Sequence, residues 1–363
     1  MLVTVPFNAL TPAEDAADVK AAIDRVMASG WFVLGPEVEA FESEFAAASK
    51  VPHAVGVGNG TDAITLILRG LDIGPGDEVI TTPLSAAFSA LAIMMAGARP
   101  VFTDIDPERL TLDPRAVEAV ITSRTRAIMP VHLYGQAADM RPLEAIASRH
   151  NLALVEDAAQ AHLATADGRP VGTIGIAAAT SFYPTKNLGA AGDGGAVLTR
   201  DTQLAARIKR LRNGGQSSRY RHAEFGVNSR LDELQAAILR ARLRYLPTWT
   251  AKRRAVAARY RAALHGAHVR IPREFDAGHV YHLFPVLTAD RDRFQAHMTQ
   301  RKIETLIHYP EAISRQSALT AASPAMCPIA DQVCSQVVSL PMYPGLSEAA
   351  VAAVAEAAST FGE

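Results

Sequence analysis

Cysteine is scarce in this sequence. Cys327 and Cys334 are the only two, which is too few for a disulfide framework or for a cysteine-based zinc site. No other motif predicts a bound metal. The two cysteines are expected to be small buried residues of a protein that stays in a reducing compartment.

An excess of charge of one sign and long hydrophobic runs are also missing. The 36 Lys and Arg against 37 Asp and Glu give a net charge of -1, so no overall field attracts nucleic acid or an anionic membrane. No segment approaches the roughly 18 consecutive apolar residues that span a bilayer. Residues 1–6 lack the basic start and long apolar run of a signal peptide. These absences predict a cytoplasmic protein without nucleic-acid or membrane partners.

One stretch, about residues 250–264, gathers basic residues on a predicted helix. Alanines and apolar residues are interleaved with them, and no aromatic stacking platform or zinc motif accompanies them. We therefore expect a solvated helix face rather than a DNA-binding one. The basic residues are Lys252, Arg253, Arg254, Arg259 and Arg261.

Short apolar strands alternate with helices from residue 53 onward. Such strands indicate an α/β fold with a mostly parallel sheet that is covered by helices on both faces. Because 363 residues exceed one ordinary core, we expect two domains. They are a large domain with an N-terminal arm, residues 1–247, and a smaller α/β domain, residues 248–363, with Pro247 breaking the helix between them. The strands of the large domain are expected at about residues 53–57, 78–82, 100–104, 126–133, 152–156, 178–183 and 195–199.

The first helix is predicted to begin at Thr11-Pro12-Ala13-Glu14. Thr11 would cap it, Pro12 fits the first turn, and Glu14 would complete a capping box. Gly30 suits its C-terminal end.

Lys186 lies in an almost uncharged segment, residues 181–195, that is rich in glycine and small residues. A surface lysine normally has other charges around it, because its ammonium is strongly hydrated. Desolvation would lower the pKa of the amine and let it attack a carbonyl. The alternative is an ordinary loop lysine between two strands, and only its surroundings decide between the two.

Two further patterns place polar groups at strand ends. Residues 56–61, with the sequence Gly-Val-Gly-Asn-Gly-Thr, turn from a strand into a helix, whose free N–H groups would bind an anion. A tight turn is an equally compatible interpretation. Glu156 and Asp157 follow a buried apolar strand, where each needs a partner. Asp157 would either cap a helix or face a cationic ring nitrogen.

Together these patterns predict a cofactor. The carboxyl ends of such strands form the ligand-binding edge of the sheet. A phosphate cradle, a carboxylate and an activated lysine are the protein parts that pyridoxal phosphate (PLP) requires. The cradle would bind its phosphate, Asp157 would keep its pyridine nitrogen protonated, and Lys186 would form the Schiff base.

The sequence resembles the sugar aminotransferases of the DegT/StrS type, which are PLP enzymes with the aspartate aminotransferase (type I) fold. The resemblance runs from residue 34 to residue 344. Besides residues 181–195, its most diagnostic segments are Gly60-Thr61-Asp62-Ala63, Gly74-Pro75-Gly76-Asp77-Glu78-Val79, Pro130-Val131-His132-Leu133-Tyr134-Gly135-Gln136, Glu156-Asp157-Ala158-Ala159-Gln160 and residues 226–237.

The resemblance implies a role for each matching residue. Lys186 would be the Schiff-base lysine, Asp157 the partner of the pyridine nitrogen, and Gln160 the contact to the ring hydroxyl. Asn228 matches a phosphate ligand that the neighbouring subunit donates, which implies an obligate homodimer with shared active sites. The implied phosphate binders within the chain are Gly60, Thr61 and Ser181.

The resemblance also implies a two-stage transamination. An amino acid, usually L-glutamate, would convert the cofactor to pyridoxamine phosphate, which would aminate a keto-sugar. A nucleotide-linked keto-deoxyhexose in amino-sugar biosynthesis is the expected acceptor, with an aminocyclitol or another keto-sugar as alternatives. A non-catalytic regulatory member of the family is a further alternative. Related sugar dehydratases replace the lysine with histidine, and Lys186 argues against that activity.

The substrate-side residues transfer least well. Trp31, Phe32, His308 and Tyr309 are predicted pocket walls, with core packing as the alternative for the adjacent aromatics Trp31 and Phe32. Ala86 stands where many relatives place a bulky residue that stacks on the pyridine ring. We expect Phe88 to fill that space, and core packing is again the alternative.

Overall fold

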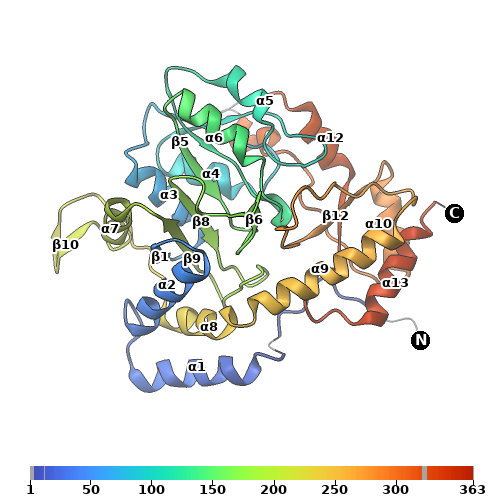
Figure 1. Cartoon of the computed structure of the whole chain (residues 1–363), viewed down its shortest axis with the longest axis horizontal. Helices are drawn as coiled ribbons and strands as arrows, with labels where there is room; N and C mark the ends of the chain where they lie inside the picture. Colours follow the sequence, from blue (N-terminus) through green and yellow to red (C-terminus); the bar gives the residue numbers. More distant parts are fainter. Residues whose placement is uncertain (1–3, 12, 321–324, 363) are drawn as a thin grey trace.

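The computed structural model describes residues 4–11, 13–320 and 325–362. The strands of its main sheet are β1 (His53–Val57), β2 (Glu78–Thr81), β3 (Arg99–Phe102), β4 (Thr125–Met129), β5 (Ala153–Asp157), β8 (Ala177–Ser181) and β9 (Gly195–Thr199). They form a seven-stranded sheet in the order β1-β9-β8-β5-β4-β2-β3 (Figure 1).

The sheet is parallel apart from one strand. β9 pairs antiparallel with both β8 and β1, whereas the remaining pairs are all parallel. The carboxyl ends of β1, β5 and β8 therefore meet at one edge, which is where ligands bind in such sheets. This edge brings together the turn after Val57, Asp157 and Ser181.

Helices cover both faces of the sheet, as predicted. Alternate strand residues enter different cores, because successive side chains point to opposite faces. Leu154 and Ala178 belong to one core cluster, and Val155 and Ala179 to another. The helices of this part are α1 (Ala16–Ser29), α2 (Pro36–Ala48), α3 (Gly60–Gly70), α4 (Phe88–Met95), α5 (Pro114–Val117), α6 (Met140–Arg149), α7 (Thr202–Leu211) and α8 (Glu233–Leu243).

The predicted start of the first helix is wrong. α1 begins at Ala16, with Asp15 at its N-cap position. Glu14 does not complete a capping box, because its carboxylate accepts hydrogen bonds from Trp249 Nε1 at 2.7 Å and Lys252 Nζ at 2.8 Å. A partner distant in sequence thus overrides the local pattern. Pro12 lies outside the described residues.

The C-terminal part has its own core. Tyr260, Phe284 and Phe294 belong to a cluster that Val5 of the N-terminal arm also joins. Val5 donates its N–H to the carbonyl of Lys302 at 2.9 Å. The elements here are α9 (Leu246–Ala263), β12 (Phe284–Leu287), α10 (Arg291–Gln300), α11 (Ser317–Thr320), α12 (Pro328–Gln336), β13 (Val337–Leu340) and α13 (Glu348–Ser359). Small hairpins elsewhere comprise β6 (Thr165–Ala166) with β7 (Arg169–Pro170) and β10 (Gln216–Ser218) with β11 (Arg221–His222).

The expectation of a solvated basic face on α9 is wrong for one residue. Arg254 and Arg259 are exposed, but Arg253 is only 4% exposed. Arg253 lies on the same buried face as Val256, Ala257 and Tyr260, at helical spacing. In the described part of the chain, no helix is both long and apolar enough to cross a membrane.

Candidate active site

The turn between β1 and α3 is the predicted phosphate cradle. Asn59 caps α3, because its side-chain oxygen accepts the N–H of Asp62 at 2.8 Å. The N–H groups of Gly60 and Thr61 reach no acceptor within the described residues. A Cβ added to Gly60 would lie 2.8 Å from the Cβ of Ser181, so these residues are in close contact. The two free N–H groups, together with the hydroxyls of Thr61 and Ser181, suit a phosphate at a helix N-terminus.

Asp157 ends β5 as a buried carboxylate, with 3% exposure. Its Oδ2 accepts a hydrogen bond from Ser89 Oγ at 2.7 Å, and its Oδ1 accepts one from the N–H of Ala159 at 3.1 Å. The second bond closes a turn, and in the described chain no helix follows Asp157 before β6, so the helix-capping interpretation is wrong. The two bonds fix the orientation of the carboxylate at the sheet edge.

Gln160 joins the sheet edge to the C-terminal part of the chain. Its Oε1 accepts the N–H of Tyr134 at 2.7 Å, and its Nε2 donates to the hydroxyl of Tyr309 at 3.0 Å. Burial and the charge of Asp157 raise the pKa of Tyr309 to about 12, although the bond from Gln160 acts in the opposite direction. Tyr309 therefore lies close to Asp157 as a neutral phenol.

Lys186 is partly buried. Desolvation lowers the pKa of its amine to about 8, although the carboxylate of Asp157 acts in the opposite direction. Burial and the charge of Lys186 lower the pKa of His162 to about 3 and that of His308 to about 4. The same two causes hold the pKa of His282 well below its ordinary value. With these imidazoles neutral, Lys186 is the group that titrates near pH 8.

Both carboxylate oxygens of Glu156 accept hydrogen bonds from protein donors. His132 Nδ1 accepts the N–H of Ala138 at 3.0 Å, so its Nε2 carries the proton and donates to Glu156 Oε2 at 3.0 Å. Burial alone would raise the pKa of Glu156, but His132 and backbone N–H groups hold it below its ordinary value. The backbone donors are those of Gly172, Ile174 and Gly175. Glu156 thus ties this loop to the strand that carries Asp157.

Glu156→Ala is expected to lower the free energy of unfolding by about 3–5 kcal/mol, because it leaves buried donors unpaired. Urea unfolding at pH 7 measures the loss. The contribution is present above the ordinary carboxyl pKa and disappears as the pH falls, because folding lowers the pKa of Glu156. Glu118→Ala, which removes a half-exposed ion pair with Arg149, is the control, with a loss below about 1 kcal/mol. Equal losses in the two variants would contradict the prediction.

A cavity of about 290 Å³ adjoins Lys186. Neither the cradle residues nor Asp157 lines it. Its walls come from the N-terminal arm, the lysine loop, α8, α9 and the segment after β13. The lining residues are Asn8, Ala9, Leu10, Thr11, Ala13, Glu14, Asp15, Pro184, Thr185, Lys186, Asn187, Gly189, Arg242, Trp249, Lys252, Arg253, Tyr343, Pro344 and Gly345.

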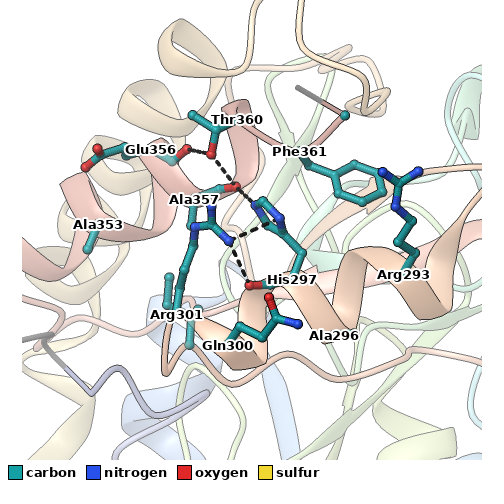
Figure 2. Close-up of a pocket in the computed structure, with 12 residues that line it drawn as sticks. Arg293, Ala296, His297, Gln300, Arg301, Ala353, Glu356, Ala357, Thr360 and Phe361 are labelled. Carbon is teal, nitrogen blue, oxygen red and sulfur yellow. Dashed lines mark hydrogen bonds between the residues drawn. The ribbon is translucent and has the colours of Figure 1, made fainter.

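Figure 2 shows a second cavity, of about 740 Å³, between α10 and α13. Arg301 Nη1 donates to His297 Nδ1 at 3.1 Å, and His297 Nε2 donates to the carbonyl of Ala357 at 2.7 Å. The hydrogen-bonding groups of His297 are thus paired with protein atoms. None of the predicted site residues lines this cavity. Among the described residues, no group of His, Cys, Asp and Glu could hold a metal ion.

Four of the predicted site residues are exposed, and the structure gives no contact between them and Lys186. Trp31 and Phe32 are 57% and 44% exposed, and Trp31 Nε1 donates to the carbonyl of Val33 at 2.8 Å. Phe88 is 62% exposed at the start of α4, next to the Ser89 that contacts Asp157. Asn228 is exposed as well. Their assigned roles stay predictions.

Sequence reasoning missed three contributors. Ser89 fixes Asp157, the backbone of Tyr134 fixes Gln160, and His282 lies near Lys186. Tyr134 falls in the diagnostic segment 130–136. That pattern marks the segment as typical of the family but does not predict what Tyr134 contacts. Ser89 and His282 have no local signal, because Ser89 contacts Asp157, 68 residues away in the chain, and His282 contacts Asn187, 95 residues away.

Comparisons with known proteins agree with this geometry. The model of the DegT/DnrJ/EryC1/StrS aminotransferase family matches residues 13–359. The chain is 47% identical to dTDP-3-amino-3,4,6-trideoxy-alpha-D-glucose transaminase of Streptomyces venezuelae, covering 99% of this chain and 96% of the relative. It is 44% identical to a pleiotropic regulatory protein of Geobacillus stearothermophilus, over 91% of each chain.

A solved structure is similar as well. The crystal structure of S. venezuelae DesV in complex with a ketimine intermediate superposes with a TM-score of 0.95. The two sequences are 48% identical, and the match covers 98% of this chain and 97% of that one. The free N–H groups at Gly60 and Thr61, the fixed carboxylate of Asp157 and the desolvated amine of Lys186 fit a phosphorylated pyridine aldehyde. The chain belongs to the DegT/DnrJ/EryC1/StrS aminotransferase family, with the type I fold and with pyridoxal phosphate as its cofactor.

Proposed function

We propose that the protein transfers an amino group from an amino acid, L-glutamate, to a nucleotide-linked keto-deoxyhexose. One observation carries the chemistry: a lysine amine with its pKa lowered to about 8 lies near the carboxylate of Asp157. The S. venezuelae relative, named as a transaminase of a dTDP-linked sugar, supports the acceptor class. A screen of nucleotide keto-sugars against the pyridoxamine form tests it. If no keto-sugar reacts while a cyclitol ketone does, the nucleotide-sugar acceptor is wrong.

Lys186 and Asp157 would carry the reaction. Bound pyridoxal phosphate supplies a ring that withdraws electrons from the substrate carbon. Lys186 would hold the cofactor covalently until the amino donor displaces it, and would then move a proton to and from the substrate as base and acid. Asp157, fixed by Ser89 and Ala159, would keep the ring nitrogen protonated.

The remaining residues would position the cofactor. The N–H groups of Gly60 and Thr61 and the hydroxyl of Ser181 would bind its phosphate. Gln160 would contact the ring hydroxyl while it holds Tyr309 at 3.0 Å. His308 and Tyr309 would then form the wall that faces the substrate.

We also propose a homodimer with shared active sites. Phe88, Met95, Trp31 and Phe32 are large apolar side chains with 44–62% exposure, and a partner subunit would shield them from water. Asn228, exposed in a single chain, would reach the phosphate of the partner subunit. Size measurement in solution, with and without Asn228→Ala, tests the assembly and the contribution to cofactor binding separately.

A domain boundary near residue 247 is part of the proposal. The separate core around Tyr260 and Phe284 supports it. Residues 1–247 would then form the cofactor-binding domain and residues 248–363 the small domain.

Cofactor capture is expected to depend on pH through Lys186. Only the neutral amine attacks the aldehyde, so the capture rate should rise about tenfold per pH unit below the pKa of about 8 and level off above it. Stopped-flow absorbance of cofactor-free protein mixed with pyridoxal phosphate between about pH 6.5 and 10 measures this rate. The control is Nα-acetyl-lysine, whose rate should keep rising through pH 10. The same continued rise in the protein would contradict the lowered pKa.

A regulatory role is the second candidate, favoured by the name of the Geobacillus relative. An absorbance spectrum of the purified protein, with and without L-glutamate, separates the two. Bleaching of the lysine-linked cofactor by glutamate supports the enzyme. An unchanged spectrum favours a binding protein that uses the same fold.

A further inference from the structure

Arg253 of α9 is a buried cation with unused donors. It is 4% exposed, and its Nη1 donates to the carbonyls of Tyr281, His282 and Met342 at 3.1, 3.2 and 2.8 Å. Its Nε is buried without a partner. Among the described residues, no hydrogen bond engages Nη2 and no carboxylate pairs with the guanidinium. Arginine is rarely buried without a counter-charge, because desolvating an unpaired charge is costly.

Arg253 lines the 290 Å³ cavity that Lys186 also lines. Besides Lys186, two other basic side chains line it, and each pairs with a carboxylate: Arg242 with Asp15 at 2.8 Å and Lys252 with Glu14 at 2.8 Å. Burial alone lowers the pKa of Arg253 to about 10, which agrees with the lack of a carboxylate neighbour. The described walls of the cavity therefore carry an uncompensated positive charge at Arg253.

The geometry of the guanidinium selects the ligand. The three carbonyls fix Nη1, and Nε and Nη2 form the opposite edge, whose two parallel N–H groups match a carboxylate. A volume of 290 Å³ lies at the lower end of ligand pockets, which span roughly 300–1,000 Å³. It suits an amino acid rather than a nucleotide-linked sugar.

We propose that Arg253 binds a carboxylate of the amino-acid donor through Nε and Nη2, in the cavity beside Lys186. The inference rests on the proposed aminotransferase function and adds to it a residue that selects the donor. Arg253 does not take part in the chemistry at the substrate carbon. Its role is to hold the donor.

The test compares donors that differ in one carboxylate. L-Glutamate, L-glutamine and L-isoglutamine are added to the wild-type holoenzyme, to Arg253→Gln and to Arg254→Gln, and the cofactor absorbance gives the apparent Kd of each. Arg254 is the matched control, because it is the next residue of α9 and its Nε donates to the carbonyl of His279 at 2.9 Å, outside the cavity.

The wild type is expected to bind glutamate about 10- to 100-fold more tightly than one of the two amides, as for a hydrogen bond to a charged group. That amide identifies which carboxylate is bound. Arg253→Gln should raise the apparent Kd of glutamate by the same factor. It should change the apparent Kd of that amide by less than about threefold. Arg254→Gln should leave the apparent Kd of all three donors within about twofold of the wild-type values.

An equal loss for all three donors would show that Arg253 only supports the fold, and would overturn the inference. So would a wild type that binds the three donors equally. A second measurement does not require the variant to fold: calorimetry with the inert analogue glutarate should show binding to the wild-type holoenzyme, whereas glutaramide should not bind. Equal binding of the two analogues would also overturn the inference. If no donor changes the wild-type spectrum, the proposed function fails instead.

Discussion

Lys186→Ala is expected to remove the absorbance of the lysine-linked cofactor and to lower turnover by at least about 10³-fold. The loss combines two functions of one amine, the covalent attachment of the cofactor and the transfer of a proton, and proton transfer alone contributes roughly 10²–10⁴-fold. The neutral histidines near Lys186 cannot replace it, because a ring nitrogen does not form the same stable link. Absorbance scans and steady-state turnover of the purified variant measure both losses.

Lys20→Ala is the control, because Lys20 is an exposed residue of α1 that pairs with Asp24. This variant should match the wild type in spectrum and rate. Retained activity in Lys186→Ala would refute the assignment of the reactive lysine. Added methylamine should restore part of the proton transfer in Lys186→Ala, which separates a missing amine from a misfolded site.

Asp157→Asn is expected to lower turnover by about 10²–10³-fold, the size of effect found when one fixed electrostatic partner is removed from an active site. The amide keeps the size of the side chain and its acceptor for the N–H of Ala159, so the fold should survive. It lacks the negative charge that would keep the ring nitrogen protonated. Single-turnover measurements with L-glutamate should show slow proton transfer after normal donor binding.

Asp139→Asn is the matched control, because Asp139 precedes α6 and its side chain makes no cap hydrogen bond. Its turnover should lie within about twofold of the wild type. If Asp157→Asn instead weakens donor binding without slowing the single turnover, Asp157 does not act on the ring.

The sequence predicts the fold and the reacting groups because both leave local patterns. The strands around Leu154 and Ala178 are apolar until their last two residues, since both faces of the sheet are covered. The lysine, the carboxylate and the glycine turn lie at strand ends, and a parallel sheet brings those ends to one edge.

Other contacts leave no local pattern. Arg253 has the sequence surroundings of a solvated helix, and its burial depends on carbonyls 28 to 89 residues away. The start of α1 depends on Trp249 and Lys252 in the same way, because they engage Glu14. The partners of exposed residues such as Phe88 and Asn228 would lie on a second chain, which the order of one sequence does not reveal.

The N-terminal arm has a mechanical consequence. Val5 packs in the C-terminal core, and the following residues line the cavity beside Lys186 before α1 begins. The polypeptide therefore crosses between the two parts of the molecule twice, at the arm and at the start of α9. A buried core cluster that includes Leu84 and Val131 of the first part and Leu283 and Val333 of the second connects the two parts as well. The two covalent crossings and this shared core together oppose a free swing of one part against the other, so the cavity walls that the arm and α9 supply are held together by the fold of both parts.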